Sequence, residues 1–126
     1  MKHLLTTAAI WAATALNAQP VAVQLDADEV TALLTGNTAI GDWDGVPYRQ
    51  YFGEDGVTLF AQTEARTTRG QWRIDPESDE YQSLWPGDDD WEGWIVMVWM
   101  DEYYWLSRST PPTVFEVVEG QQLVEE

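Results

Sequence analysis

Short strands separated by regularly spaced turns follow Gly36, and they constrain the fold more than any other feature of the sequence. Runs of Val, Ile, Thr and aromatic residues recur, with turn signals about every eight to twelve residues. The expected strands span 37–40, 46–52, 57–63, 70–74, 80–85, 91–100, 103–107 and 113–118. About seven or eight antiparallel strands, each joined to the next by a short turn, predict a mainly β protein built as a small meander barrel.

One short helix is expected before these strands, over residues 27–35. Asp26 suits the N-cap position and Glu29 stands three residues later, as in a capping box. Apolar residues then follow at i, i+3 and i+4, which places them on one face. Because so short a helix is marginal alone, we expect it to plug or cap one end of the barrel.

Three further local expectations follow from the pattern. The segment 41–45 combines two glycines with two aspartates, which predicts a turn. The run 91–100 is apolar at both alternating sets of positions, so we expect both faces of that strand to be covered. In the strand 70–74, Trp72 is expected on one face and Arg73 on the other.

The first residues have the layout of a secretory signal peptide. Lys2 and His3 precede an apolar stretch that ends in small residues before Ala18. The stretch is shorter than the roughly 20 apolar residues that a membrane anchor needs. The sequence therefore predicts a signal peptide over 1–18, cleaved near Ala18, and a single domain over 19–126 that is periplasmic or secreted.

Removal of the signal peptide would leave a chain without the usual catalytic and metal-binding side chains. The sequence has no Cys and one His, and its single Lys and single His are Lys2 and His3. A Ser-His-Asp triad, a zinc site with Cys or His ligands and a Schiff-base lysine are thereby excluded. No cofactor, metal or catalytic residue is expected. Calcium ligands at Asp42 and Asp44, or at 88–90, are the alternative, but without EF-hand spacing solvated turns are favoured.

Acidic residues dominate the charge. The chain has 22 Asp and Glu against 6 Lys and Arg, for a net charge of −16. This excess disfavours nucleic acid and anionic membranes as partners, and no segment is long and apolar enough for a membrane span. A cationic protein partner remains open, although the scattered placement of the acids favours a role in solubility.

Several motifs resemble those of a group of small secreted bacterial proteins with no assigned function. They are Gly-Asn-Thr at 36–38, Tyr-Arg-Gln-Tyr-Phe at 48–52 with Asp-Gly at 55–56, Gly-Gln-Trp-Arg at 70–73 and Gly-Gln-Gln-Leu at 120–123. Many members carry two cysteines near the positions of Gln82 and Gly93, which this chain lacks. A Gly-x-Trp pattern at 41–43 and 70–72 also resembles lipocalin and avidin barrels, which implies a similar architecture.

The aromatic residues are the main candidates for a binding site. They can line a pocket for an apolar or sugar-like ligand, or form the core of a small domain without disulfides. Two arginines on expected strands can grip a carboxylate ligand inside the barrel, or form outward salt bridges, which is the favoured alternative. The wider aromatic set is Trp43, Trp72, Trp85, Trp91, Trp94, Trp99, Tyr103, Tyr104 and Trp105, and the predicted ligand-binding residues are Trp72, Trp85, Trp91, Trp99, Arg49 and Arg73.

These observations predict a non-enzymatic exported protein that binds a small ligand or a cationic protein partner. Two alternatives remain. Paired carboxylates among the many acids can hydrolyse glycosides if their separation is right and one pKa is raised. A structural component of the cell envelope, without a discrete ligand, is the other.

Overall fold

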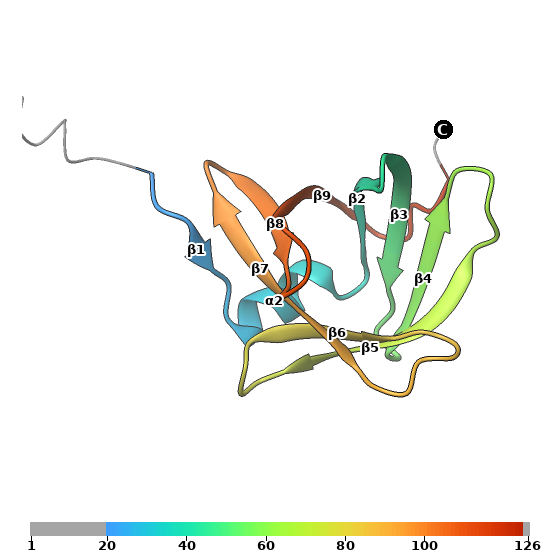
Figure 1. The fold of residues 1–126 in the computed structure, drawn as a ribbon, viewed down its shortest axis with the longest axis horizontal. Coiled ribbons are helices and arrows are strands. Elements are labelled where there is room, and N and C mark those ends of the chain that lie inside the picture. Colours follow the sequence, from blue (N-terminus) through green and yellow to red (C-terminus); the bar gives the residue numbers. More distant parts are fainter. Residues whose placement is uncertain (1–19, 125–126) are drawn as a thin grey trace, which may run out of the picture.

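A closed barrel of antiparallel strands forms the body of the protein (Figure 1). The computed structural model describes residues 20–124, and the predicted signal peptide at 1–18 lies outside them. Each barrel strand pairs with the next in sequence, and β9 returns to pair with β2, which confirms the expected mainly β meander barrel. The barrel strands are β2 (Asn37–Trp43), β3 (Val46–Phe52), β4 (Val57–Gln62), β5 (Thr68–Asp75), β6 (Glu80–Leu84), β7 (Glu92–Trp99), β8 (Glu102–Leu106) and β9 (Thr113–Glu119).

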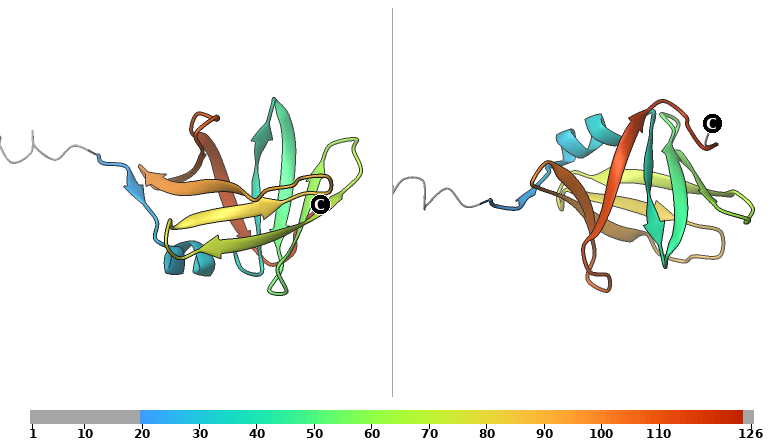
Figure 2. Two further views of the ribbon diagram at one scale, coloured as in Figure 1. Left: turned by 60° about the horizontal axis from the view of Figure 1, so that its bottom comes forward. Right: turned by 90° about the horizontal axis from the view of Figure 1, so that it is seen from above.

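The helix α2 (Ala27–Leu34) closes one end of this barrel (Figure 2). Its capping box is complete: Glu29 N–H donates to Asp26 Oδ1 at 2.9 Å, and Asp26 N–H donates to Glu29 Oε1 at 3.0 Å. Val30 and Leu34 are fully buried against the barrel interior. The sequence prediction of a capping helix is therefore confirmed, with the helix ending at Leu34.

A short strand, β1 (Val23–Gln24), joins the outer edge of the barrel before this helix. It pairs with the half of β7 that β6 does not reach, because β6 pairs with β7 only along Glu92–Trp94. Leu25 N–H then donates to Val96 O at 2.9 Å, and Ala27 N–H donates to Asp79 Oδ1 at 2.8 Å. These bonds tie the start of α2 to β7 and to the β5–β6 turn. No helix among residues 20–124 has the length and apolar character that a membrane crossing requires.

Aromatic side chains fill the half of the barrel nearest α2. Phe52 makes edge-to-face contacts with Trp72 and Tyr81, at ring-centroid distances of 5.4 and 5.5 Å. Trp105 stacks on Phe115 at 4.1 Å. Such pairs add to the area that each ring buries, so this aromatic core replaces the disulfides that the chain cannot form. The packing is concentrated toward the helix, and the opposite end of the barrel is less filled.

The predicted turn over 41–45 is correct only for its last two residues. Strand β2 continues to Trp43, and the left-handed residues Asp44 and Gly45, with φ of 51° and 79°, make the turn by themselves. Cross-strand pairing of Trp43 with Val46 overrides the local turn signal, as expected for a two-residue hairpin. The longer strand carries Trp43 to the open end of the barrel.

Strand β7 also differs from its expected environment. Val96 is fully buried inside the barrel, but Trp99 is 42% exposed and Met100, just beyond the strand, is 61% exposed. The prediction that both faces of 91–100 are covered is therefore wrong for its last residues. The two-residue strand β1 pairs with the edge of β7 in the same sheet and does not cover its outer face.

Candidate functional site

A cavity of about 360 Å³ occupies the end of the barrel opposite α2. Its walls come from inward-facing residues, because alternate side chains of a strand point into the barrel. Strand β3 contributes Tyr48 and Gln50, and β6 contributes Tyr81 and Ser83. The full lining is Trp43, Tyr48, Gln50, Phe60, Gln62, Thr68, Tyr81, Ser83, Trp85, Glu92, Trp94 and Trp105.

A buried polar network forms the floor of the cavity. Trp105 Nε1–H donates to the Tyr48 hydroxyl at 3.0 Å. Gln50 Nε2 donates to the Tyr81 hydroxyl at 2.8 Å and to Thr58 Oγ1 at 3.0 Å. Thr58 in turn donates to the backbone carbonyl of Tyr51 at 2.8 Å. These bonds satisfy groups that would otherwise be costly to bury, and they hold the floor side chains in place.

Both floor tyrosines are neutral at ordinary pH. Burial raises the pKa of Tyr48 to about 12, against a lowering by the hydrogen bond from Trp105 and a further rise from the Asp42 charge. Burial also raises the pKa of Tyr81, which accepts the Gln50 bond. A tyrosine hydroxyl can accept hydrogen bonds through its lone pairs and donate one through its proton. The Tyr48 hydroxyl accepts a hydrogen bond from Trp105, so its proton is left to be donated to an acceptor on a ligand.

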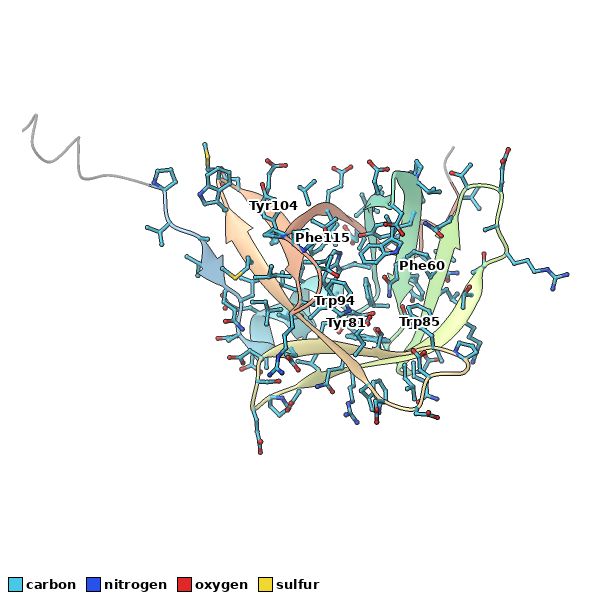
Figure 3. All side chains as sticks on the ribbon, viewed as in Figure 1. Phe60, Tyr81, Trp85, Trp94, Tyr104 and Phe115 are labelled. Atoms are coloured by element: carbon cyan, nitrogen blue, oxygen red, sulfur yellow. The ribbon has the colours of Figure 1, made fainter. Side chains whose placement is uncertain are left out.

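Aromatic pairs form the wall and mouth of the cavity (Figure 3). Trp43 of β2 meets Trp94 of β7 edge-to-face at 5.7 Å, although these strands are not neighbours in the sheet. Phe60 stacks on Tyr48 at 5.2 Å and meets Trp85 edge-to-face at 5.9 Å. The mouth is therefore framed by rings from several strands.

Gly70 makes room for one of these rings. A Cβ atom at this position would lie 2.5 Å from Cε3 of Trp85 and 2.9 Å from the carbonyl oxygen of Leu84. Both distances are shorter than non-bonded carbon contacts allow. The glycine of the Gly-Gln-Trp-Arg motif thus lets the Trp85 ring approach the backbone of β5, where it lines the cavity.

Glu92 is the one charged residue in the cavity lining of the described chain. It is the first residue of β7 and lies opposite Ser83 of β6. Its Oε1 accepts a hydrogen bond from Trp94 Nε1–H at 3.1 Å, which orients the carboxylate beside the ring. The site therefore combines aromatic walls, a polar floor and one carboxylate near the mouth.

Of the six residues predicted to bind a ligand, the structure brings only Trp85 to the cavity. Trp72 lies in the core, where its Nε1–H donates to Gly53 O at 2.9 Å. Trp99 is exposed at the end of β7 that lies away from the cavity mouth. Binding through these tryptophans stays a prediction, and their positions do not form one site.

The other three predicted residues lie on the outside of the barrel. Arg73 donates to Gln82 Oε1 at 2.7 Å, and its guanidinium lies 4.0 Å from the ring centre of Trp91. Arg49 Nη1 donates to the carbonyl oxygen of Gln122 at 2.9 Å. The two arginines therefore do not face the cavity; among residues 20–124 they contact an amide, a ring and a backbone carbonyl. A hydrogen bond from Ser78 lowers the pKa of Asp75, and the Arg73 charge helps to lower it.

Eight of the twelve cavity-lining residues were absent from the aromatic and arginine candidates: Tyr48, Gln50, Phe60, Gln62, Thr68, Tyr81, Ser83 and Glu92. Strand alternation was the available signal, because Tyr48, Gln50 and Phe52 share one face of β3. Of the acidic candidates, Asp42 lies in strand β2, and Asp88 Oδ2 accepts a hydrogen bond from Trp85 N–H at 3.2 Å in the turn after β6.

Comparison with models of known families, with curated proteins and with solved structures finds no match. The resemblance to small secreted bacterial proteins therefore remains a prediction, and the site must be interpreted from its own chemistry.

Proposed function

We propose that this protein is an exported, non-enzymatic binding protein that holds a small organic molecule in the open end of its barrel. The observation that carries the proposal is the 360 Å³ cavity, which lies within the roughly 300–1,000 Å³ typical of small-molecule sites. Aromatic walls with a few polar groups on the floor are also typical of such sites.

The chemistry of the lining supports binding over carboxylate-based hydrolysis. Glycoside hydrolysis needs two carboxyl groups about 5–9.5 Å apart, on either side of the scissile bond. The lining of the described chain holds one carboxylate, Glu92. The floor hydroxyls of Tyr48 and Tyr81 are held neutral by burial, so they are suited to donate and accept hydrogen bonds rather than to act as bases.

A fragment screen on the purified protein tests the proposal, with intrinsic tryptophan fluorescence and ligand-observed NMR as readouts. The screen is repeated on Gln62→Trp, which places a large ring in the cavity mouth. Gln71→Trp is the matched control, because Gln71 is an exposed glutamine on the outer face of β5. Both variants are first checked for a wild-type far-UV circular dichroism spectrum.

We expect compact aromatic or aliphatic fragments to bind the wild type and the Gln71→Trp variant. Gln62→Trp should weaken the same fragments at least about tenfold, which corresponds to about 1.4 kcal/mol of lost contact. Fragments that bind all three proteins equally, or no fragment binding at all, would refute a binding function for the cavity.

A further inference from the structure

We infer that the ligand is an organic cation whose positively charged group lies at the cavity mouth, between the tryptophan rings and Glu92. The inference rests on the proposed binding function and names the chemical class of its ligand. It requires three properties of the site: a negative charge, accessible ring faces and hydrogen-bonding groups deeper in the cavity.

The charge of the lining is the first property. Glu92 is the one charged residue among the twelve that line the cavity, and Lys, Arg and His are not among them. The five arginines of the chain lie elsewhere, and the two on strands β3 and β5 that were candidates make contacts outside the barrel. A ligand carboxylate or phosphate would meet a like charge without a compensating cation, whereas a ligand ammonium would be paired.

The aromatic mouth is the second property. Trp43 and Trp94 meet edge-to-face, at 78° between ring planes, so the ring that presents its edge has faces that its partner does not cover. Phe60 and Trp85 also meet edge-to-face, at 69°, although one face of Phe60 is stacked on Tyr48. A ring face carries negative potential, and quaternary ammonium groups are recognised by such clusters of aromatic rings. Trp94 joins the two properties, because its indole N–H holds the Glu92 carboxylate at 3.1 Å.

The floor is the third property. Below the mouth, the Tyr48 hydroxyl has a proton to donate, and Gln50 and Ser83 supply further polar atoms. A cationic group at the mouth therefore fits best when it is joined by a short chain to a hydroxyl or carbonyl group that reaches the floor. The excess of acidic residues over the whole chain, with a net charge of −16, also attracts a cation toward the barrel.

Choline and its neutral carbon isostere 3,3-dimethyl-1-butanol test this inference, because they differ in charge and hardly in shape. The anion 3,3-dimethylbutanoate serves as the third probe. Dissociation constants are measured by isothermal titration calorimetry at low ionic strength. We expect choline to bind roughly 2- to 30-fold more tightly than the alcohol, which is the range of cation–π stabilisation, and the anion to bind most weakly.

Two variants locate the charge effect. Glu92→Gln removes the charge but keeps a side-chain oxygen that can accept the Trp94 N–H bond. Glu116→Gln is the matched control, because it removes one negative charge from an exposed position on β9 outside the cavity lining. We expect the preference for choline over the alcohol to become smaller in Glu92→Gln, where only the rings still favour the cation, and to persist unchanged in Glu116→Gln.

The outcomes separate the two proposals. If Glu92→Gln keeps the full preference, the placement of the positive group beside Glu92 is wrong. If the alcohol binds as tightly as choline, the cationic class is wrong while the binding function stands. The same conclusion follows if none of the three probes binds a barrel that binds other, uncharged fragments. If no probe and no fragment binds the cavity, the binding function itself fails and the cationic class fails with it.

Discussion

Replacement of Tyr48 by phenylalanine gives a sharp test of the cavity floor. The Tyr48 side chain is 4% exposed and Trp105 is 6% exposed, and the Trp105 Nε1–H donates to the Tyr48 hydroxyl at 3.0 Å. The substitution removes the acceptor and leaves the indole N–H without its partner. A buried polar group that loses its partner costs about 1–3 kcal/mol of folding free energy.

The loss is measured by urea unfolding, followed by tryptophan fluorescence. For a small domain, with a denaturant slope of about 1–3 kcal/mol per M, the midpoint should fall by roughly 0.5–2 M while the slope stays unchanged. Tyr51→Phe is the matched control, since Tyr51 is the neighbouring tyrosine on β3 and faces the outside of the barrel. We expect this control to change the free energy of unfolding by less than about 0.5 kcal/mol.

A double-mutant cycle with Trp105→Phe isolates the hydrogen bond from other effects of the two changes. Because Trp105→Phe removes the donor, the second substitution, Tyr48→Phe, should then cost about 1 kcal/mol less than it does in the wild type. A Tyr48→Phe protein as stable as the wild type, or a coupling energy near zero, would refute the proposed floor network.

Three further predictions concern pH, packing and capping. Burial raises the pKa of Tyr48 in the folded state to about 12, above its usual value of 10. The unfolded chain therefore loses this proton at a lower pH than the folded protein does, and the contribution of neutral Tyr48 to stability is complete only below pH 10. That stability should be lost by about 1.4 kcal/mol per unit as pH rises from 10 to 12, and urea midpoints over this range should fall less steeply in Tyr48→Phe. Gly70→Ala should displace the Trp85 ring, destabilise the protein by about 1–3 kcal/mol and shift the tryptophan fluorescence maximum. An unchanged urea midpoint together with an unchanged fluorescence spectrum would contradict the close packing of Trp85 on Gly70. Asp26→Ala should remove the N-cap of α2 and lower the free energy of unfolding by about 1 kcal/mol in the same assay, whereas Asp28→Ala, in the first turn but outside the cap, should cost less.

The barrel could be predicted from the sequence because its signals are local. The capping pair at Asp26 and Glu29, and the glycines at the turns, act within a few residues of where they occur. The turn over 41–45 could not be placed correctly, because pairing of β2 with β3 extends the strand past Gly41. Cross-strand register depends on residues distant in sequence, and turn composition alone does not contain it.

The cavity was harder to predict, because residue type does not say which face of a strand points inward. Trp72, Trp91 and Trp99 are chemically alike, yet one is in the core, one lies under an arginine outside and one is exposed. Alternation along a strand does identify facing residues once one of them is known to be buried. Since Trp72 faces inward, Arg73 had to face outward, and the same reasoning places Arg49 outside when Tyr48 is inside.

Indole N–H signals in a ¹⁵N–¹H NMR spectrum test the central claim most directly, because residues 19–126 contain seven tryptophans and each gives its own signal. Titration with a bound fragment, or with choline, should shift the signals of the four cavity tryptophans, which are Trp43, Trp85, Trp94 and Trp105. The signals of Trp72, Trp91 and Trp99 should stay in place. Shifts confined to these last three, or spread equally over all signals, would show that the ligand does not bind in the open end of the barrel.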